Sequence, residues 1–333
     1  MAKARARATV RGASGSAGSA RVDAVVIGRN EGGRLIDCLT SLAGQVRRVV
    51  YVDSGSTDGS LEAAAAAGAR VIALDMAQPF TAARARNAGL EALAADPPEF
   101  VQFIDGDCIL QQGWIPRAIG FLDDNLRAAV VCGRRRERFP EASIFNRLID
   151  AEWDTPLGEV KACGGDALMR HDPVAALGGF KADLIAGEEP ELCLRLRQRG
   201  WTIWRIDAEM TLHDAAILRF GQWWRRTERA GHAFAEGAAR FSSEAFPHWQ
   251  RETRRIWAWG LALPATALLG ALIHPAALLL LLAYPLQVLR LGPRMGWAAA
   301  LFNTLGKFPE AVGALRFWYN QRRARRSGLI EYK

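Results

Sequence analysis

The chain has 333 residues, half of them hydrophobic, and carries 43 Lys and Arg against 35 Asp and Glu, for a net charge of +8 and a pI near 9.6. This length allows one large domain or two around a sizeable core. The basic balance suits an anionic lipid surface or a diphosphate, and no nucleic-acid recognition motif is present. The five cysteines form no C-x-x-C pair, which argues against a disulfide framework and a zinc site and favours a reducing compartment.

Residues 1–20 are rich in Arg, Ala, Gly and Ser and lack the apolar segment of a secretory signal, so a disordered basic tail is expected there. Strand and helix patterns then alternate four times within about 100 residues, which predicts a mainly parallel, doubly wound α/β sheet. The expected strands are residues 24–27, 48–52, 71–74 and 100–104, and the expected helices are residues 33–43, 61–67 and 81–95.

The pattern is less regular beyond residue 107. Helices are expected at residues 114–126, 142–152, 190–199 and 221–237, and strands at residues 128–132, 160–169 and 201–206. The expected domains are therefore an α/β catalytic domain over residues 21–240 and a helical, membrane-associated region over residues 241–333.

A long segment without Asp, Glu, Lys or Arg covers residues 256–289, well above the roughly 20 residues of one membrane span. His274 and Pro275 interrupt it, and arginines flank both ends, which favours a membrane hairpin with both ends in the cytoplasm. A re-entrant or interfacial hairpin and a buried helical pair are the alternatives. The tail 296–333 mixes apolar and basic residues, as in an amphipathic helix at an anionic membrane surface.

Two acidic residues, Asp105 and Asp107, directly follow the apolar run 100–104. Carboxylates at the end of a buried strand repel each other and are costly to bury unless a cation or hydrogen-bond donors offset the charge. Mg²⁺ or Mn²⁺ prefers such oxygen ligands and shares its other positions with phosphate and water. The pair predicts a metal–diphosphate site at the carboxyl edge of the sheet, and an ordinary turn is the alternative.

The first two strands also end in polar residues, Arg29, Asn30, Glu31 and Asp53. Because the carboxyl ends of parallel strands meet at one edge, these residues are expected to line a nucleotide pocket beside Asp105. Asp53 would accept the N3–H of a uracil-type base. Arg86, near the start of the expected helix 81–95, is a candidate ligand of the diphosphate.

Four motifs carry a family resemblance, at residues 25–31 (Val-Val-Ile-Gly-Arg-Asn-Glu), 52–58 (Val-Asp-Ser-Gly-Ser-Thr-Asp), 85–89 (Ala-Arg-Asn-Ala-Gly) and 105–107 (Asp-Gly-Asp). In this order and spacing they resemble the family 2 glycosyltransferases with the GT-A fold, specifically the membrane-associated bacterial type, over roughly residues 22–235. The resemblance implies a Rossmann-like GT-A catalytic domain. It also implies inverting transfer of a sugar from a nucleotide-diphospho-sugar, with a UDP-sugar favoured.

The resemblance also implies a general base. Glu188 and Glu189 match the family's Glu-Asp motif, whose second acid takes the proton from the acceptor hydroxyl. That position holds Glu189, whose extra methylene shifts the carboxylate, so Glu188 is a rival for the same role. An alternative is that both acids complement the start of a helix before Pro190.

The family pattern places Gly164, Gly165 and Asp166 in the loop that faces the acceptor, where small residues let the backbone approach a sugar closely. Asp107 would hold Mg²⁺ or Mn²⁺ on the diphosphate, with Asp105 near the ribose or a water on the metal. His213 is a candidate third metal ligand, although an isolated histidine is more often a packed or surface residue.

The expected partners are a nucleotide-sugar donor, a lipid-linked or glycan acceptor and membrane lipid at the cytoplasmic face of the inner membrane, in polysaccharide or glycoconjugate synthesis. Two other classes are alternatives. A nucleotidyltransferase of similar fold would usually carry a Gly/Lys-rich phosphate loop, which the sequence lacks. An inactive membrane scaffold would not need Asp105, Asp107 and Glu189, all of which are present.

Overall fold

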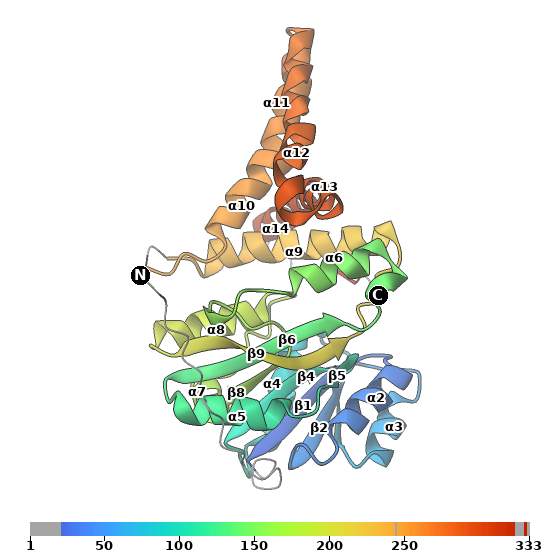
Figure 1. The fold of residues 1–333 in the computed structure, drawn as a ribbon, viewed down its shortest axis with the longest axis vertical. Helices are drawn as coiled ribbons and strands as arrows, with labels where there is room; N and C mark the ends of the chain where they lie inside the picture. The colour runs from blue at the N-terminus through green and yellow to red at the C-terminus, as the bar shows by residue number, and fades with distance from the viewer. Residues whose placement is uncertain (1–20, 244, 324–329, 332–333) are drawn as a thin grey trace.

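A mixed nine-stranded sheet forms the centre of the protein (Figure 1). The structure is a computed structural model that describes residues 21–243, 245–323 and 330–331, so the expected tail 1–20 lies outside the described residues. The strand order is β3-β2-β1-β4-β8-β6-β9-β5, with β7 beside β9. The strands are β1 (Val22–Gly28), β2 (Arg48–Asp53), β3 (Arg70–Ala73), β4 (Phe100–Asp105), β5 (Cys108–Leu110), β6 (Ala128–Glu137), β7 (Gly158–Val160), β8 (Ala167–Arg170) and β9 (Thr202–His213).

The first four strands are parallel, as the sequence predicts. Strand β1 is buried along nearly its whole length, as expected for a strand covered on both faces. Helix α4 packs on β1 and β2, and Gly89 makes this contact close, because a Cβ there would lie 2.3 Å from Cγ1 of Val25. The glycine of the motif at 85–89 thus serves helix–sheet packing.

The second half of the sheet corrects the expectation of a mainly parallel fold. Strand β8 is antiparallel to both β4 and β6, and β5 and β7 are antiparallel to β9, so parallel and antiparallel pairings are mixed. The strand expected over 160–169, with an interruption at Gly164 and Gly165, is two strands, β7 and β8, and the loop between them contains these glycines. Strand β5 and the short helix α7 are additional elements, too short for a periodic pattern to mark them.

Helices connect and cover the strands (Figure 1). Helix α2 packs on β5, α5 on β6 and β9, and α8 on β9, around one large hydrophobic core. The helices of this part are α2 (Gly33–Leu42), α3 (Ser60–Ala66), α4 (Ala82–Leu93), α5 (Trp114–Asp124), the 3₁₀ turn η1 (Pro140–Ala142), α6 (Ile144–Glu152), α7 (His171–Ala176), α8 (Glu188–Gln198) and α9 (Phe220–Arg240).

The C-terminal helices are built onto α9 (Figure 1). They are α10 (Gln250–Ile256), the π-helical turn η2 (Trp257–Ala262), α11 (Leu263–Ala271), the 3₁₀ segment η3 (Pro275–Leu282), α12 (Ala283–Met295), α13 (Trp297–Leu305) and α14 (Lys307–Arg322). The amphipathic helix expected within the tail 296–333 is therefore two helices, α13 and α14. Helix α14 packs against α9 and buries Ala311, Ala314 and Phe317.

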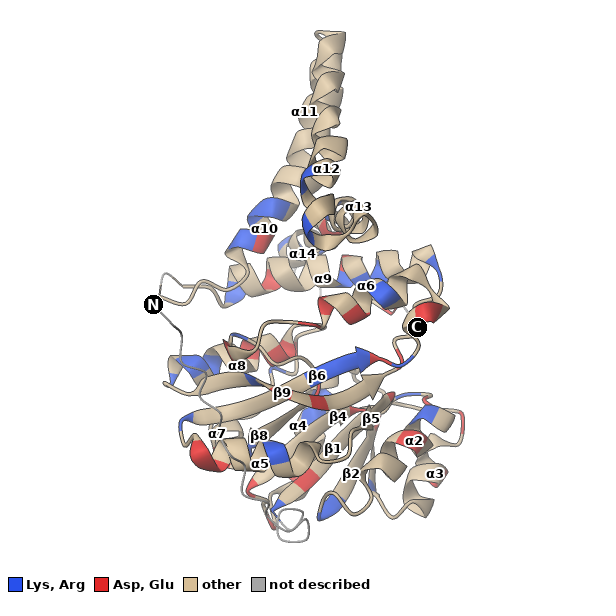
Figure 2. Ribbon diagram, viewed as in Figure 1, with Lys and Arg blue, Asp and Glu red and all other residues tan. Residues whose placement is uncertain are grey.

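The apolar segment forms a hairpin that projects away from the sheet (Figure 1). Helix α11 packs against η3, and the turn between them carries Leu272 and Ile273, which are 83% and 90% exposed. Figure 2 shows the outer part of the hairpin without charged residues and several basic positions near its base. By length and composition, Pro275–Met295 could cross a membrane, and only 6% of its most apolar window is buried.

Candidate active site

The polar strand ends meet at one edge of the sheet, as predicted. Gly28 pairs with Asp53, and Ile27 pairs with Asp105, so β1, β2 and β4 end side by side. This parallel register brings residues 29–31 close to both aspartates. The site is therefore assembled by strand pairing between segments that lie far apart in the sequence.

Asp53 organises the turn that follows β2. The side chain is 1% exposed, and its Oδ2 accepts the backbone N–H groups of Gly55 and Ser56, each at 2.8 Å. Its Oδ1 accepts the hydroxyl of Tyr51 at 2.9 Å. These bonds hold the predicted base-binding residue in place and show that it also shapes the loop.

Asn30 and Arg29 tie the first loop to its surroundings. Asn30 has a left-handed backbone with φ of 56°, and its side-chain oxygen accepts the N–H of Thr57 at 2.8 Å. The guanidinium of Arg29 lies 4.7 Å from the ring centroid of Phe80 and 3.1 Å from a carboxylate oxygen of Glu331. The third residue of this loop, Glu31, forms an ion pair with Arg34 at 2.7 Å.

Arg86 is the central cation of the site. It is 3% exposed, and its two terminal nitrogens bind Oδ1 of Asp105 at 2.8 Å and Oε1 of Glu188 at 2.6 Å. The ring of Phe180 lies 5.7 Å from the guanidinium carbon. The planar guanidinium thus joins two carboxylates from different elements, and Arg86 positions Asp105 rather than pointing freely at a diphosphate.

Asp107 and His213 come together through the pairing of β5 with β9. Oδ1 of Asp107 lies 3.2 Å from Nε2 of His213, and Cys108 is close to both. Burial raises the pKa of the Cys108 thiol well above its usual range, so the thiol stays protonated. The remaining donors, a carboxylate and an imidazole, fit Mn²⁺ or Mg²⁺ when phosphate oxygens complete the coordination.

Asp166 is fully buried and holds two site residues, Asp105 and Arg135, in place. Its Oδ1 accepts the backbone N–H of Asp105 at 3.1 Å, and its Oδ2 accepts the Thr211 hydroxyl at 2.9 Å and faces Nε of Arg135 at 3.1 Å. Both oxygens of this predicted acceptor-binding residue are therefore bound inside the protein. In this arrangement Asp166 orients Asp105 and Arg135.

The glycines of the same loop leave space for the charged side chains that pack beside them. A Cβ on Gly165 would lie 3.0 Å from both Nη2 of Arg86 and Oδ2 of Asp105, so a side chain there would crowd the central ion pair. Gly164 has a left-handed backbone with φ of 84° and donates its N–H to Glu189. Small residues are needed here for contacts within the protein.

The two candidate bases face different partners at the start of α8. Glu188 binds Arg86, whereas Oε1 of Glu189 accepts the backbone N–H of Cys163 at 2.7 Å and Oε2 accepts that of Gly164 at 3.0 Å. Burial raises the pKa of Glu189 above the usual value for a glutamate. Glu189 therefore contacts the predicted acceptor loop directly.

Sequence reasoning missed Arg135 and Trp153. Both line a cavity of about 130 Å³ together with Asp105 and His213. The guanidinium carbon of Arg135 lies 5.3 Å from the ring centroid of Trp153, whose ring meets that of His213 edge to face at 4.7 Å. The arginine run at 134–136 could have indicated Arg135, but the expected strand 128–132 ended before this run, whereas β6 includes it.

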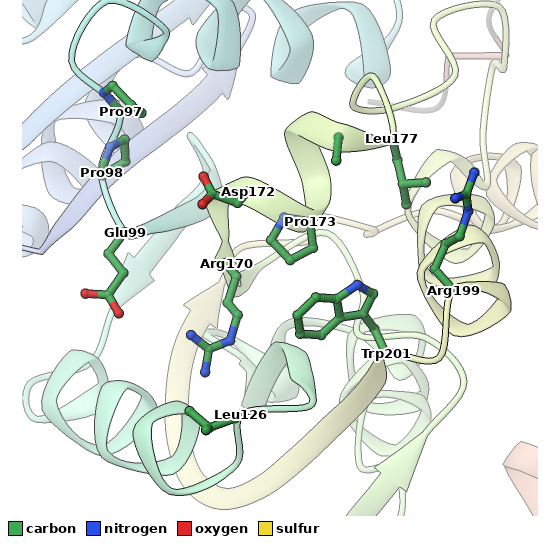
Figure 3. A pocket seen from close by; sticks show the side chains of 11 residues that line it. Pro97, Pro98, Glu99, Leu126, Arg170, Asp172, Pro173, Leu177, Arg199 and Trp201 are labelled. Carbon is green, nitrogen blue, oxygen red and sulfur yellow. The ribbon is translucent and has the colours of Figure 1, made fainter.

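A larger cavity of about 900 Å³ lies at the opposite edge of the sheet (Figure 3). Glu99, which lines it, precedes β4, and Arg170 pairs with Phe100 at the amino end of the same strand. Its lining includes none of the predicted site residues. Two predicted site residues, Asp105 and His213, line the smaller cavity instead.

Residues 23–172 match the protein-family model of glycosyl transferase family 2. The match covers less than half of the chain, and over these residues the protein is similar to glycosyl transferase family 2. The family 2 match includes Asp53, Arg86, Asp105 and Asp107. It ends before Glu188, Glu189 and His213, which the tertiary structure adds to the same site.

Known proteins and structures are similar to this chain. The pre-mycofactocin glycosyltransferase of Mycobacterium tuberculosis is 28% identical over 239 residues, which cover 68% of this chain and 49% of the relative. The chain thus spans about half the length of that curated relative. The mannosyltransferase PcManGT from Pyrobaculum calidifontis, solved with GDP-Man and Mn²⁺, has a TM-score of 0.63 at 21% identity and covers 89% of this chain and 87% of its own.

A second solved structure, S. aureus TarS 1-349, has a TM-score of 0.51 at 15% identity, with 92% of each chain covered. Likeness at these identities establishes the fold. The domain that contains the family 2 match therefore has the GT-A fold that the four motifs imply.

Proposed function

We propose that the protein is an inverting glycosyltransferase that moves a sugar from a nucleotide-diphospho-sugar, with a UDP-sugar favoured, to an acceptor hydroxyl. The observation that carries this proposal is the sheet edge where Arg86 joins Asp105 to Glu188 while Asp107 faces His213. The match of residues 23–172 to the family 2 model supports the reaction class. The pairing of GDP-Man with Mn²⁺ in PcManGT supports a nucleotide-sugar donor and a divalent metal.

Asp107 and His213 would hold Mn²⁺ or Mg²⁺, with Asp105 beside them. When bound, the ion neutralises the charge that develops on the leaving nucleoside diphosphate. Arg86 and the Asp166 carboxylate keep Asp105 in one orientation, so the acidic edge is organised before the donor arrives.

Glu189 is the proposed general base. It would take the proton of the acceptor hydroxyl as the hydroxyl oxygen bonds to the anomeric carbon and the bond from that carbon to the diphosphate breaks. Burial raises the pKa of Glu189, which makes its carboxylate a stronger base than an exposed glutamate. Glu188 instead forms an ion pair with Arg86 at 2.6 Å, which occupies its Oε1.

The acceptor is proposed to be lipid-linked or a glycan presented at the cytoplasmic face of the inner membrane, as in polysaccharide or glycoconjugate synthesis. The support is the uncharged hairpin, whose turn exposes Leu272 and Ile273. Arg254 and Arg290 lie at the two ends of the uncharged segment, as in a hairpin with both ends on the cytoplasmic side. Insertion of the hairpin would keep the catalytic domain near the lipid headgroups.

A thermal-shift titration of the detergent-purified full chain with UDP, GDP, dTDP and CMP, with and without Mn²⁺, tests this function. A ligand at 100 times its dissociation constant should add about 2.7 kcal/mol of stability. We expect a Mn²⁺-dependent shift with one nucleoside diphosphate, absent in Asp107→Ala and present in the control Asp124→Ala, a surface position on α5.

Two outcomes would contradict the proposal. Stabilisation by no nucleotide under any condition would favour an inactive scaffold. Binding of a nucleoside triphosphate with release of pyrophosphate would favour a nucleotidyltransferase. In either case the acidic edge would serve a purpose other than sugar transfer.

A further inference from the structure

A compact cluster of two thiols and one carboxylate lies beside the acceptor loop, although the absence of a C-x-x-C pair from the sequence argues against a zinc site. Cys163 belongs to the loop between β7 and β8, while Glu189 and Cys193 are one turn apart on α8. The two sulfur atoms are 3.9 Å apart. Oε1 of Glu189 lies 3.0 Å from Sγ of Cys163 and 2.9 Å from Sγ of Cys193.

The separation of the two sulfur atoms fits a tetrahedral metal ion, and Oε1 of Glu189 would move about 0.5 Å away from each sulfur to become a ligand of the same ion. With zinc–sulfur bonds of about 2.3 Å, two thiolates on one zinc ion are about 3.8 Å apart. The observed separation of 3.9 Å is close to this value, and all three ligand atoms lie within reach of one cation. Without a metal, both thiols donate to the same carboxylate oxygen, so one divalent cation would take the place of two protons.

We propose that Cys163, Cys193 and Glu189 form a zinc site, with water as the fourth ligand, and that zinc binding inhibits the enzyme. The inhibitory part rests on the proposed function, because it assigns Glu189 as the base. A carboxylate oxygen bonded to zinc cannot also accept the proton of an acceptor hydroxyl. The site would thus link the transfer rate to the supply of a thiophilic metal.

The donor set separates this site from the one at Asp107. Thiolates select zinc, cadmium and other thiophilic ions, whereas Mg²⁺ and Mn²⁺ prefer carboxylate, phosphate and water oxygens. Cys163 is half-buried and gives access from solvent, while Cys193 and Glu189 are buried. The N–H groups of Cys163 and Gly164 already donate to Glu189 and would orient it as a ligand.

The protons bound to the thiols give the site a distinct signature. Both thiols donate to Oε1 of Glu189, so each carries a proton when no metal is bound. Metal binding requires thiolates and therefore releases protons. Two protons per bound ion are expected, and the affinity should fall as the pH is lowered.

Cadmium binding to the full chain, kept reduced with a phosphine, tests the site without any activity measurement. We expect one Cd²⁺ per chain, a thiolate-to-cadmium absorption band and release of about two protons per ion. The band should be lost in Cys163→Ser and in Cys193→Ser. It should persist in the control Cys132→Ala, which removes a buried thiol of β6 that is outside the cluster. No band, or an unchanged band in both serine variants, would overturn the proposal.

Inhibition is measured separately, as the Mn²⁺-supported transfer rate with and without one equivalent of Zn²⁺. The expected result is at least a tenfold loss that a chelator reverses, with little loss in Cys193→Ser relative to its own zinc-free rate. Equal inhibition of both proteins would overturn the inhibitory role. A preparation without transfer that still binds cadmium would contradict the proposed function and leave the metal site standing.

Discussion

A single arginine holds the candidate site together at the residue scale. Arg86 is buried, and its two nitrogens neutralise Asp105 and Glu188, which come from β4 and α8. The carboxylates of Asp105 and Glu188, which are 30% and 11% exposed, are tolerated here because the planar guanidinium binds one on each side. Removal of that cation would leave both acids with uncompensated charge.

Arg86→Ala is therefore expected to lower the free energy of unfolding by about 3 kcal/mol and to abolish transfer. Arg86→Lys should keep the charge but lose one of the two contacts. Its stability and activity should therefore lie between those of the wild type and Arg86→Ala. Chemical denaturation and an activity assay measure these effects. Arg84→Ala is the control, since Arg84 lies on the same helix and its half-buried side chain binds the backbone carbonyls of Asp75 and Gln78. Equal effects at both positions would contradict the role of Arg86.

The two candidate bases can be separated by isosteric substitution. Glu189→Gln should reduce kcat by about 100-fold or more, because the amide cannot accept the acceptor proton. Glu188→Gln should mainly weaken the ion pair with Arg86, with a larger effect on stability than on kcat. A larger loss of kcat in Glu188→Gln would transfer the role of base to Glu188.

The acid limb of the pH–rate profile gives a second test of Glu189. A general base acts only when deprotonated, so activity should fall as the pH drops through its pKa. Because burial raises the pKa of Glu189, this limb should lie above the 4.5 of an ordinary glutamate. A rate profile of kcat/KM measures it, and a limb at or below that value would contradict the assignment.

At the scale of elements, the contact between α9 and α14 joins the two parts of the chain. The helices meet backbone to backbone, since a Cβ on Gly231 would lie 2.1 Å from the carbonyl oxygen of Glu310 and one on Gly313 would lie 1.9 Å from that of Glu228. Close approach of this kind requires glycine on both helices. The hairpin is thereby fixed to the catalytic domain.

Gly313→Ala should destabilise this contact by about 2 kcal/mol, because the added methyl group must push the helices apart. Differential scanning calorimetry or limited proteolysis at the helical region would detect the change. Gly221→Ala is the control on α9, where a Cβ would meet nothing within 4 Å. The control should be neutral or stabilising by less than about 1 kcal/mol.

His232 makes the same contact sensitive to acid. It is fully buried on α9, and burial lowers its pKa from 6.5 to about 4. Below pH 6.5 the unfolded chain binds a proton that the folded chain refuses, so stability should fall between pH 6.5 and pH 4 and change little from this source below that. Thermal unfolding of the wild type and His232→Gln at pH 7.5 and 5 measures the difference. The same pH dependence in both proteins would contradict the assignment.

The whole molecule combines an α/β domain with an apolar hairpin that projects from it (Figure 1). Several leucines of the hairpin are more than half exposed in the described chain, and a lipid bilayer would cover them. They are Leu268, Leu269, Leu272, Leu279, Leu282, Leu286 and Leu289.

Flotation with liposomes tests membrane attachment. The double variant Leu272→Glu and Ile273→Glu places two charges at the turn of the hairpin and should remove most of the protein from the lipid fraction. The control is Leu126→Glu, which changes a leucine that is 75% exposed on the catalytic domain. Recovery of the wild-type chain in the soluble fraction without detergent would contradict the attachment.

The sequence by itself determined the parallel half of the sheet and the acidic edge. Short apolar runs that alternate with helical patterns predict β1 to β4. Because these strands are parallel, Asp53 and Asp105 lie at the same edge of the sheet. The motif order also indicated the resemblance to family 2 and the GT-A fold, which the comparisons confirm. These features depend on local periodicity and on short motifs, both of which can be read along a single chain.

Only the tertiary structure decided how the remaining groups meet. The antiparallel position of β8, the contact of Asp107 with His213, and the meeting of Cys163 with Cys193 join residues that lie far apart in sequence. Short strands such as β5 give no periodic signal, and no local pattern reports which buried arginine will neutralise which carboxylate. Those pairings follow from the packing of the whole core, because burial of each charge requires a specific partner from another element.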